Sequence, residues 1–293
     1  MARKTPVPMA PVRGVLPVLL PFSPRGPAYD DFFMLRWLAS IPAAWLLAAA
    51  ALFPLAVMAQ SGRDAASAFE AVIRWAPFLF TQGFLFNVLI SVLAMALGTA
   101  VGALAGLGLI SRNRLLRGIV QAYVTFFRNV PWLVLLFIIL LGLPFQVQAF
   151  GMTIPLPGWI KVVIGLALPV SANIAEVVRG AIQSVPTAQW EGAESLGFTR
   201  RQTIWQIILP QCVKRMLPPW MNWYAIMTMS TPLASLLGVN EVISLTRQAM
   251  EAEGNYPELL MPFYGFALLL FLAYCYPIAR LTMRLERRFA VKT

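Results

Sequence analysis

The chain alternates long apolar stretches with short segments that hold most of its charges. A helix that crosses the apolar core of a bilayer needs about 20 mostly apolar residues. We predict six membrane-spanning helices from stretches that meet this requirement. They cover residues 38–58, 85–110, 119–143, 159–181, 216–237 and 260–281. The pattern therefore predicts an all-α protein that crosses the membrane several times.

The composition agrees with a membrane protein. Of the 293 residues, 59% are hydrophobic and 12% are charged, whereas soluble domains carry about 25% charged residues. This composition excludes the classes of soluble enzyme, disordered chain and secreted disulfide scaffold. The net charge of +11 would suggest nucleic acid in a soluble protein. Here the basic residues lie between the apolar stretches, where anionic lipid headgroups act, so the expected partner is membrane lipid and not nucleic acid.

The distribution of Lys and Arg predicts the orientation, because cytoplasmic segments carry an excess of both. If both termini are cytoplasmic, the outer segments hold Arg63, Arg74 and Arg247. The cytoplasmic segments then hold many more: Arg3, Lys4, Arg13, Arg25, Arg36, Arg112, Arg114, Arg117, Arg200, Arg201, Lys214, Arg215, Arg284, Arg287, Arg288 and Lys292. We therefore expect a multi-pass protein of the inner (plasma) membrane with both termini inside. Residues 1–36, rich in proline, are predicted as a cytoplasmic tail.

The sequence gives little support for a catalytic site or a metal-binding site. The chain has no histidine, and Cys212 and Cys275 do not follow a metal-binding spacing. Histidine triads, histidine metal sites and histidine proton relays are thereby excluded. We expect no catalytic residue, no metal site and no cofactor.

The cytoplasmic segment 182–215 has the local chemistry of two short helices joined at a corner. Thr187 is suited to cap the first helix, and Gly197 stands where a left-handed residue ends it. Thr199 opens the second helix with Gln202 three residues later, which completes a capping box. Pro210 is predicted to end the second helix. A compact, bent element of this kind outside the membrane suggests a docking surface.

This segment resembles the EAA motif of ABC importer permeases. The motif reads Glu-Ala-Ala, three residues, Gly, nine residues, Ile, any residue, Leu-Pro. Its counterparts here are Glu191, Ala193, Gly197, Ile207, Leu209 and Pro210. One position departs from the motif, because Gly192 replaces the second alanine. A glycine there costs about 1 kcal/mol of helix propensity.

Three further stretches resemble the polar amino-acid group of these permeases, and the resemblance covers about residues 80–284. The stretch that begins Phe127-Arg128 and continues to Gly142-Leu143-Pro144 is similar to "FRGTPLLVQLF…GLP". Residues 175–186 are similar to "AEIVRGGIQSVP", and residues 233–239 to "LASVIGV". Residues 229–232 depart from the group, which commonly has Lys-Asp-Thr-Ser where this chain has Met-Ser-Thr-Pro.

The resemblance implies the membrane subunit of an ABC importer with the type I fold, moving polar amino acids or a similar small polar solute. It implies a transmembrane domain at 80–284 with the coupling loop at about 187–210, an extra helix at 37–60 and a basic tail at 285–293. The implied partners are an ABC ATPase, a second permease subunit and a periplasmic solute-binding protein. The chain has no phosphate-binding loop of the G-x-x-x-x-G-K-[ST] type, so ATP hydrolysis is expected in the separate ATPase and not here.

Several polar residues within the spans are candidates for the translocation path. Arg128 precedes a proline, and Glu176 lies three residues before Arg179 on one helix face. The fifth span is polar and contains prolines, and irregular backbone at membrane depth is tolerated inside protein or beside water. Purely structural roles remain open for these residues. Arg128 could anchor at the membrane interface, Glu176 and Arg179 could form a local ion pair, and the polar residues of the fifth span could make contacts between helices. The candidates are Arg128, Glu176, Asn222, Thr228, Ser230 and Thr231.

Two other functions compete with the importer. An ion-coupled secondary transporter or channel would need no ATPase, but the sequence has few acids at midplane positions. An intramembrane enzyme would need catalytic side chains within the spans, for which there is little support.

Overall fold

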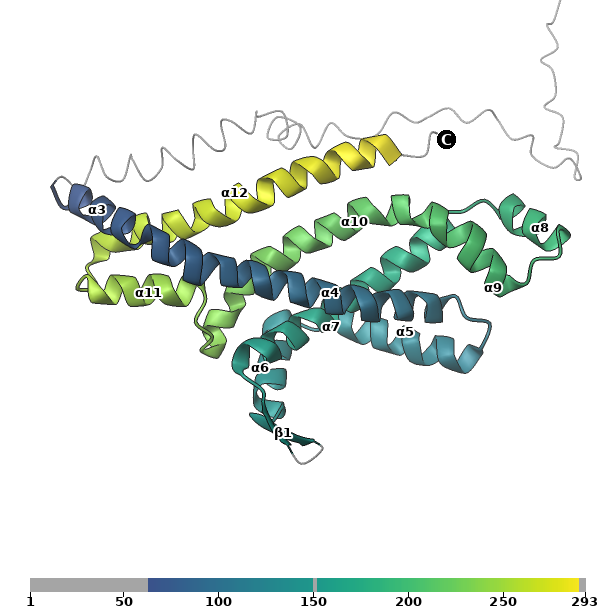
Figure 1. The fold of residues 1–293 in the computed structure, drawn as a ribbon, viewed down its shortest axis with the longest axis horizontal. Helices are drawn as coiled ribbons and strands as arrows, with labels where there is room; N and C mark the ends of the chain where they lie inside the picture. Colours follow the sequence, from purple (N-terminus) through teal and green to yellow (C-terminus); the bar gives the residue numbers. More distant parts are fainter. Residues whose placement is uncertain (1–62, 150–151, 290–293) are drawn as a thin grey trace, which may run out of the picture. The chain divides into compact units, whose positions relative to one another are not determined.

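The computed structural model describes residues 63–149 and 152–289. The chain divides into two compact units, residues 1–53 and 54–293, and the described residues belong to the second. The predicted N-terminal tail 1–36 and the predicted span 38–58 lie outside the described residues. Figure 1 shows the arrangement of the helices.

The first described helices join end to end. Helix α3 (Arg63–Phe78) continues through a π-helical turn, η2 (Leu79–Phe84), into α4 (Leu85–Leu109). Pro77 lies at the end of α3, and a proline removes a backbone donor and crowds the preceding turn. A wider π-helical turn directly after it accommodates this defect. Helix α4 matches the predicted span 85–110 within one residue, but the helical run begins well before it.

The prediction of one helix at residues 119–143 is wrong. The segment forms α5 (Arg114–Asn129) and α6 (Trp132–Gly142), which meet at an angle of 108°. Val130 is extended, as expected for a residue before a proline, and Pro131 takes the N-cap position of α6. The 11 residues of α6 reach about 16 Å, roughly half of the apolar core of a bilayer.

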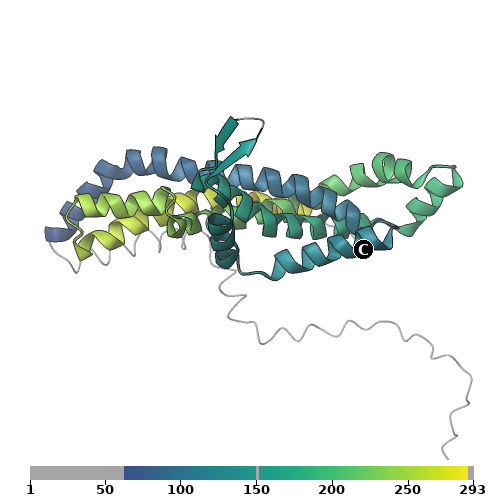
Figure 2. The same cartoon turned by 90° about the horizontal axis from the view of Figure 1, so that it is seen from below.

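A small β-hairpin interrupts the otherwise helical fold. Strands β1 (Gln146–Ala149) and β2 (Met152–Pro155) are antiparallel, with Gln146 opposite Pro155 and Ala149 opposite Met152. The all-α prediction missed this hairpin, which joins α6 to α7 (Gly158–Gln183) (Figure 2).

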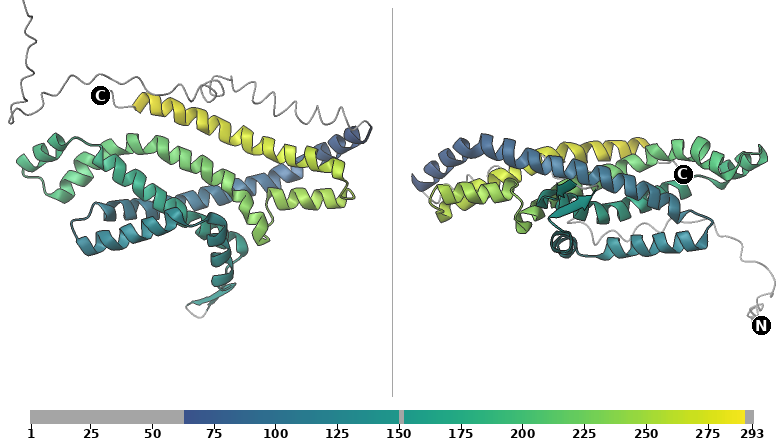
Figure 3. Two further views of the ribbon diagram at one scale, coloured as in Figure 1. Left: turned by 180° about the vertical axis from the view of Figure 1, so that it is seen from behind. Right: turned by 60° about the horizontal axis from the view of Figure 1, so that its bottom comes forward.

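The second half of the described chain is helical. Helices α8 (Thr187–Ser195) and α9 (Arg200–Gln202) follow α7, and a π-helical turn, η3 (Thr203–Ile208), leads into α10 (Leu209–Ser230). A 3₁₀ segment, η4 (Thr231–Leu237), precedes α11 (Val242–Ala252) and the long α12 (Pro257–Phe289). Figure 3 shows α10 and α12 running beside each other.

The prediction that Pro210 ends a short helix is wrong. Pro210 lies in the first turn of α10, and the helical run continues from Arg200 to Leu237. A proline within a continuous helical run removes one backbone donor and crowds the preceding turn. The π-helical turn η3 directly before α10 adds room for the proline ring.

The described residues contain three helices long and apolar enough to cross a membrane, or five if each of two bent helix pairs counts as one span. The bent pairs are α5 with α6, and the run Arg200–Leu237 with α11. Five of the six predicted spans fall in this part of the chain, so the multi-pass prediction agrees with the larger number. The first predicted span lies outside the described residues.

The core of the fold is the contact between α4 and α7 (Figure 1). Gly98, Gly102 and Gly106 follow one another at a spacing of four residues and are buried against α7. A Cβ atom built on Gly102 would lie 2.5 Å from the carbonyl oxygen of Ser171. Lipid gives helices little hydrophobic reason to associate, so small residues that permit close backbone approach drive the packing. The glycine spacing of α4 therefore serves its close packing on α7.

An ionic contact joins α3 to the turn after α11. The guanidinium of Arg74 donates to Glu253 at 2.7 Å, and the Trp75 indole N–H donates to the same carboxylate at 2.8 Å. The Trp75 hydrogen bond, helped by Arg74, holds the pKa of Glu253 below its usual value. This end of the unit is opposite to α8 and α9 in Figures 1 and 2.

Substitution of Gly102 tests this packing. We expect Gly102→Ala to lower the thermal unfolding midpoint of the purified chain, because overpacking costs about 1–3 kcal/mol. The matched control is Gly118→Ala, since a Cβ on Gly118 in α5 meets nothing within 4 Å. Equal midpoints for the two variants would contradict the close approach of α4 and α7.

Candidate translocation path and coupling loop

The corner between α8 and α9 is a Schellman motif built on Gly197. Gly197 has a φ of +78°, its N–H donates to the Glu194 carbonyl at 2.9 Å, and the Phe198 N–H donates to the Ala193 carbonyl at 3.1 Å. These two bonds satisfy carbonyls that the helix end leaves open. The predicted left-handed glycine is confirmed.

The start of the second helix also follows the sequence prediction. Thr199 accepts from the Gln202 N–H, and the Gln202 side chain accepts from the Thr199 N–H at 2.9 Å, which is a capping box. The first helix differs in detail, because Pro186 takes the N-cap position and Thr187 is the first helical residue. The prediction of Thr187 as the cap is therefore wrong. The backbone of Pro186 is already extended, and this suffices to begin the helix.

The six residues that match the EAA motif differ in their exposure. Ala193 is buried, Ile207 and Leu209 are half-buried, and Glu191, Gly197 and Pro210 are exposed. The alanine and the two aliphatic residues of the motif therefore pack against the rest of the protein, whereas its glutamate, glycine and proline are exposed to the outside. Gly192, which departs from the motif, lies within α8 with open space beside it.

Two arginines attach the loop to the membrane helices. Arg200 donates to the Ile110 carbonyl at the end of α4 at 3.3 Å, and its guanidinium lies 5.6 Å from the Trp190 ring centre. Arg215 donates to the carbonyl and hydroxyl oxygens of Ser184, both at 2.7 Å. These bonds connect the segment 182–215 to the ends of α4 and α7.

The structure brings together two of the predicted path residues, Arg128 and Glu176. Arg128 of α5 lies 3.7 Å from one Glu176 oxygen, and Arg179 of α7 lies 2.6 Å from the other. Arg179 also donates to Gln183 at 2.8 Å. We call Arg128, Glu176, Arg179 and Gln183 the polar stripe. The predicted local pair of Glu176 and Arg179 is present, and Arg128 adds a second cation from another helix.

The other predicted path residues lie on α10 and η4, apart from the polar stripe. Thr228 and Thr231 are fully buried, and their hydroxyls donate to the carbonyls of Tyr224 and Thr228. Ser230 is half-buried and donates to the Ile226 carbonyl at 2.8 Å. Asn222 is exposed. Three of these four side chains therefore satisfy their donors within their own helical run.

A buried polar cluster that the sequence analysis missed joins α4, η4 and α11. The Asn87 amide donates to Thr231 and to Glu241, both at 2.9 Å, and accepts from the Val242 N–H at 3.0 Å. Glu241 also caps α11 by accepting from Ile243 and Ser244. Glu241 lies between the predicted spans 216–237 and 260–281, yet it is fully buried. Asn87, a lone amide in an apolar run, was the available signal.

A buried lysine is the second feature that was missed. Lys161 near the start of α7 is 1% exposed. Its ammonium donates to the carbonyls of Leu140 at 3.0 Å and Leu143 at 2.8 Å, and lies 3.6 Å from the Phe145 ring centre. It thereby satisfies the last carbonyls of α6, where a positive charge also suits the helix dipole. Among the described residues, no group of three or more metal-binding side chains occurs.

Comparison with known proteins supports the architecture. The family model described as "Binding-protein-dependent transport system inner membrane component" matches residues 98–291. A probable amino-acid ABC transporter permease protein, YckA of Bacillus subtilis (strain 168), is 34% identical over 71% of this chain and 88% of the relative. The L-cystine transport system permease protein TcyB of the same organism is 30% identical over 72% of this chain and 86% of the relative.

Solved structures show the same fold. The crystal structure of an amino acid ABC transporter with histidines is 26% identical, with a TM-score of 0.63 over 75% of this chain and 98% of that chain. The MetNI methionine ABC transporter is 16% identical with a TM-score of 0.54, which supports the fold alone. These likenesses confirm the predicted type I importer fold. The chain therefore belongs to the family of inner membrane components of binding-protein-dependent transport systems, the permease subunits of ABC importers.

Proposed function

We propose that this permease moves polar amino acids inward and is driven by a separate ABC ATPase that docks on the coupling loop at 187–210. Its membership in the permease family disfavours the ion-coupled transporter or channel that the sequence left open. The observation that carries the proposal is the loop itself: two short helices fixed at Gly197, with Glu191 exposed for a partner and Arg200 tied to α4.

The polar stripe supports a zwitterionic solute. It presents one carboxylate beside two guanidinium groups, and the Glu176 side chain is 18% exposed, against 45% for Arg128 and 35% for Arg179. An amino acid carries one carboxylate and one ammonium group, and arginine suits planar recognition of a carboxylate. The relatives named as amino-acid and L-cystine permeases agree with this class of solute. The α10 and η4 candidates Asn222, Thr228, Ser230 and Thr231 stay part of the proposal.

The remaining subunits follow from the same proposal. A second permease subunit completes the path, and a periplasmic solute-binding protein delivers the solute from outside. The predicted extra helix at 37–60 lies almost wholly in the other compact unit and outside the described residues. The transport domain at 80–284 and the cytoplasmic side for residues 285–293 stay part of the proposal, although α12 continues to Phe289 and so includes the start of the predicted basic tail. Both termini are inside, as the Lys and Arg distribution indicates.

The polar stripe is tested by Glu176→Gln in the reconstituted transporter. Loss of the charge leaves Arg128 and Arg179 facing each other, so we expect uptake of the amino acid to fall roughly tenfold, equivalent to about 1.4 kcal/mol. The control is Glu70→Gln, which changes an exposed acid on α3. Normal uptake and selectivity in Glu176→Gln would make the stripe a purely structural cluster.

The coupling loop is tested by Gly197→Val. Valine at a left-handed residue costs about 1–2 kcal/mol and misdirects α8, so we expect normal membrane insertion but poor assembly with the ATPase. Substrate-stimulated ATP hydrolysis and uptake should fall together, and Glu191→Ala should give a smaller loss. Complex assembly and ATP hydrolysis are measured separately.

The matched control for the loop is Gly192→Ala. It lies in the same helix with open space beside it and gains about 1 kcal/mol of helix propensity, so we expect wild-type assembly or better. Wild-type assembly and hydrolysis in Gly197→Val would show that the ATPase couples elsewhere.

The orientation is tested by thiol labelling of intact cells. We expect an impermeant reagent to label Glu251→Cys, which is exposed in the segment predicted outside, and not Arg201→Cys. Cys212 and Cys275 are buried and contribute little background. Labelling of the second variant but not the first would reverse the proposed orientation.

A further inference from the structure

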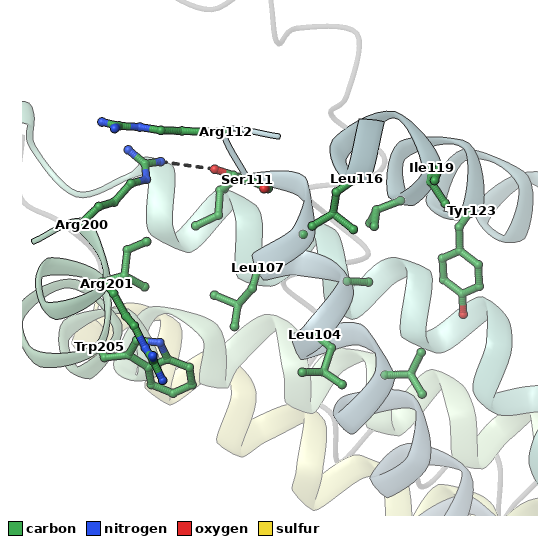
Figure 4. Close-up of a pocket in the computed structure, with 16 residues that line it drawn as sticks. Leu104, Leu107, Ser111, Arg112, Leu116, Ile119, Tyr123, Arg200, Arg201 and Trp205 are labelled. Atoms are coloured by element: carbon green, nitrogen blue, oxygen red, sulfur yellow. Dashed lines mark hydrogen bonds between the residues drawn. The ribbon is translucent and has the colours of Figure 1, made fainter. Parts of the chain in front are cut away.

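A groove outside the polar stripe lies between the end of α4, the start of α5 and the second half of the coupling loop (Figure 4). It has a volume of about 840 Å³ and an apolar wall that includes Leu104, Leu107 and Ile119. Trp205 and Tyr123 also line it. Neither the candidate path residues nor the six residues of the EAA motif lie in this groove.

The charges of the groove are all positive. Arg112, Arg200 and Arg201 line it, and none of its described lining residues is acidic. All three arginines are exposed, and within the described part of the chain none of them forms an ion pair. An anion in the groove would relieve the repulsion between the arginines of the loop and that of the α4–α5 turn.

The apolar wall of the groove continues into an exposed stripe on α4. Leu93, Leu97, Val101 and Leu104 follow at intervals of three or four residues and are 38% to 73% exposed. Residues at this spacing share one helix face. Val101 and Leu104 both line the groove, so the surface that suits acyl chains runs directly into it.

The apolar and charged parts of the groove succeed each other along α4. Leu104 and Leu107 follow each other toward the end of α4 at Leu109, and Ser111 and Arg112 lie beyond that end, as Figure 4 shows. From residue 104 to residue 109 the helix rises about 7.5 Å. The aromatic side chains Trp205 and Tyr123 combine an apolar ring with a polar atom, as side chains at the headgroup level of a membrane do.

We propose that this groove binds an anionic phospholipid, with the phosphate among Arg112, Arg200 and Arg201 and the acyl chains along Leu104 and the α4 stripe. The three arginines, with no acid among the described lining residues, favour an anionic headgroup over a zwitterionic one. A bound headgroup joins the coupling loop to the α4–α5 turn, next to the bond from Arg200 to the Ile110 carbonyl.

The test is lipid binding to the purified full-length chain in detergent micelles. Phosphatidylglycerol with brominated acyl chains is added, and the quenching of tryptophan fluorescence is measured. The contribution of Trp205 is the quenching seen in the wild type minus that seen in Trp205→Phe. We expect phosphatidylglycerol to quench at a mole fraction about tenfold lower than brominated phosphatidylcholine, with the difference shrinking at high salt. Inorganic phosphate at the same concentration should not compete.

The arginines are tested with Arg112→Gln/Arg201→Gln, which keeps the hydrogen-bonded Arg200. We expect this variant to lose the preference for phosphatidylglycerol. The matched control, Arg284→Gln/Arg287→Gln, removes two exposed arginines near the end of α12 and should keep it. Leu104→Gln retains all three charges and adds no fluorophore, but it places a polar side chain on the apolar wall and should weaken the binding of both lipids.

Three results would overturn the proposal. Equal quenching by the two lipids would mean unselective contact with bulk lipid. Competition by inorganic phosphate would mean a site for the free anion. Absence of quenching by either lipid, with Trp205 protected only in the assembled transporter, would assign the groove to a second permease subunit or the ATPase. None of these results bears on amino-acid uptake, which tests the proposed function separately.

Discussion

Close contact between α4 and α7 holds the other parts of this permease in place. Three glycines of α4 at a spacing of four residues let the two backbones approach, and a Cβ atom at Gly106 would lie 2.6 Å from the Val178 Cβ atom. Helices α5, α6 and α10 all pack against α7. The geometry of the polar stripe and the position of the short α6 therefore both depend on where α7 lies. The segment at 187–210 follows the end of α7 and is bonded to the end of α4. The contact between these two helices therefore also sets the position of this segment relative to the polar stripe.

Local chemistry predicts much of this structure. The span at 85–110, the left-handed Gly197 and the capping box of Thr199 depend on residues near one another in sequence, and all three are present. Proline was harder to interpret. Pro131 breaks the predicted third span, whereas Pro210 is absorbed in a first turn. Val130 before Pro131 is extended and ends α5, whereas a π-helical turn before Pro210 keeps the helical run continuous. Residue type alone does not distinguish these two outcomes.

The candidate site was predicted in part for the same reason. Glu176 and Arg179 lie three residues apart, so their pair could be expected from helix geometry. The approach of Arg128 to Glu176 required the packing of α5 on α7 and could not be derived from spacing. Asn87 and Glu241 are 154 residues apart, and the burial of Glu241 follows from a fold in which α11 returns to α4. Hydropathy places Glu241 in a loop between two spans because it depends only on nearby residues. It carries no information on contacts between distant helices.

The contact between Asn87 and Glu241 constrains how the permease can move. The amide joins α4 to the cap of α11, and a buried, fully bonded carboxylate is costly to separate from its partner. Any movement of α11 must therefore carry α4 with it. The same amide bonds Thr231 at the start of η4, so the left-handed turn at Gly238, with a φ of +74°, is held on both sides by a single side chain of α4. The break between α10 and α11 is therefore a braced corner and not a free hinge.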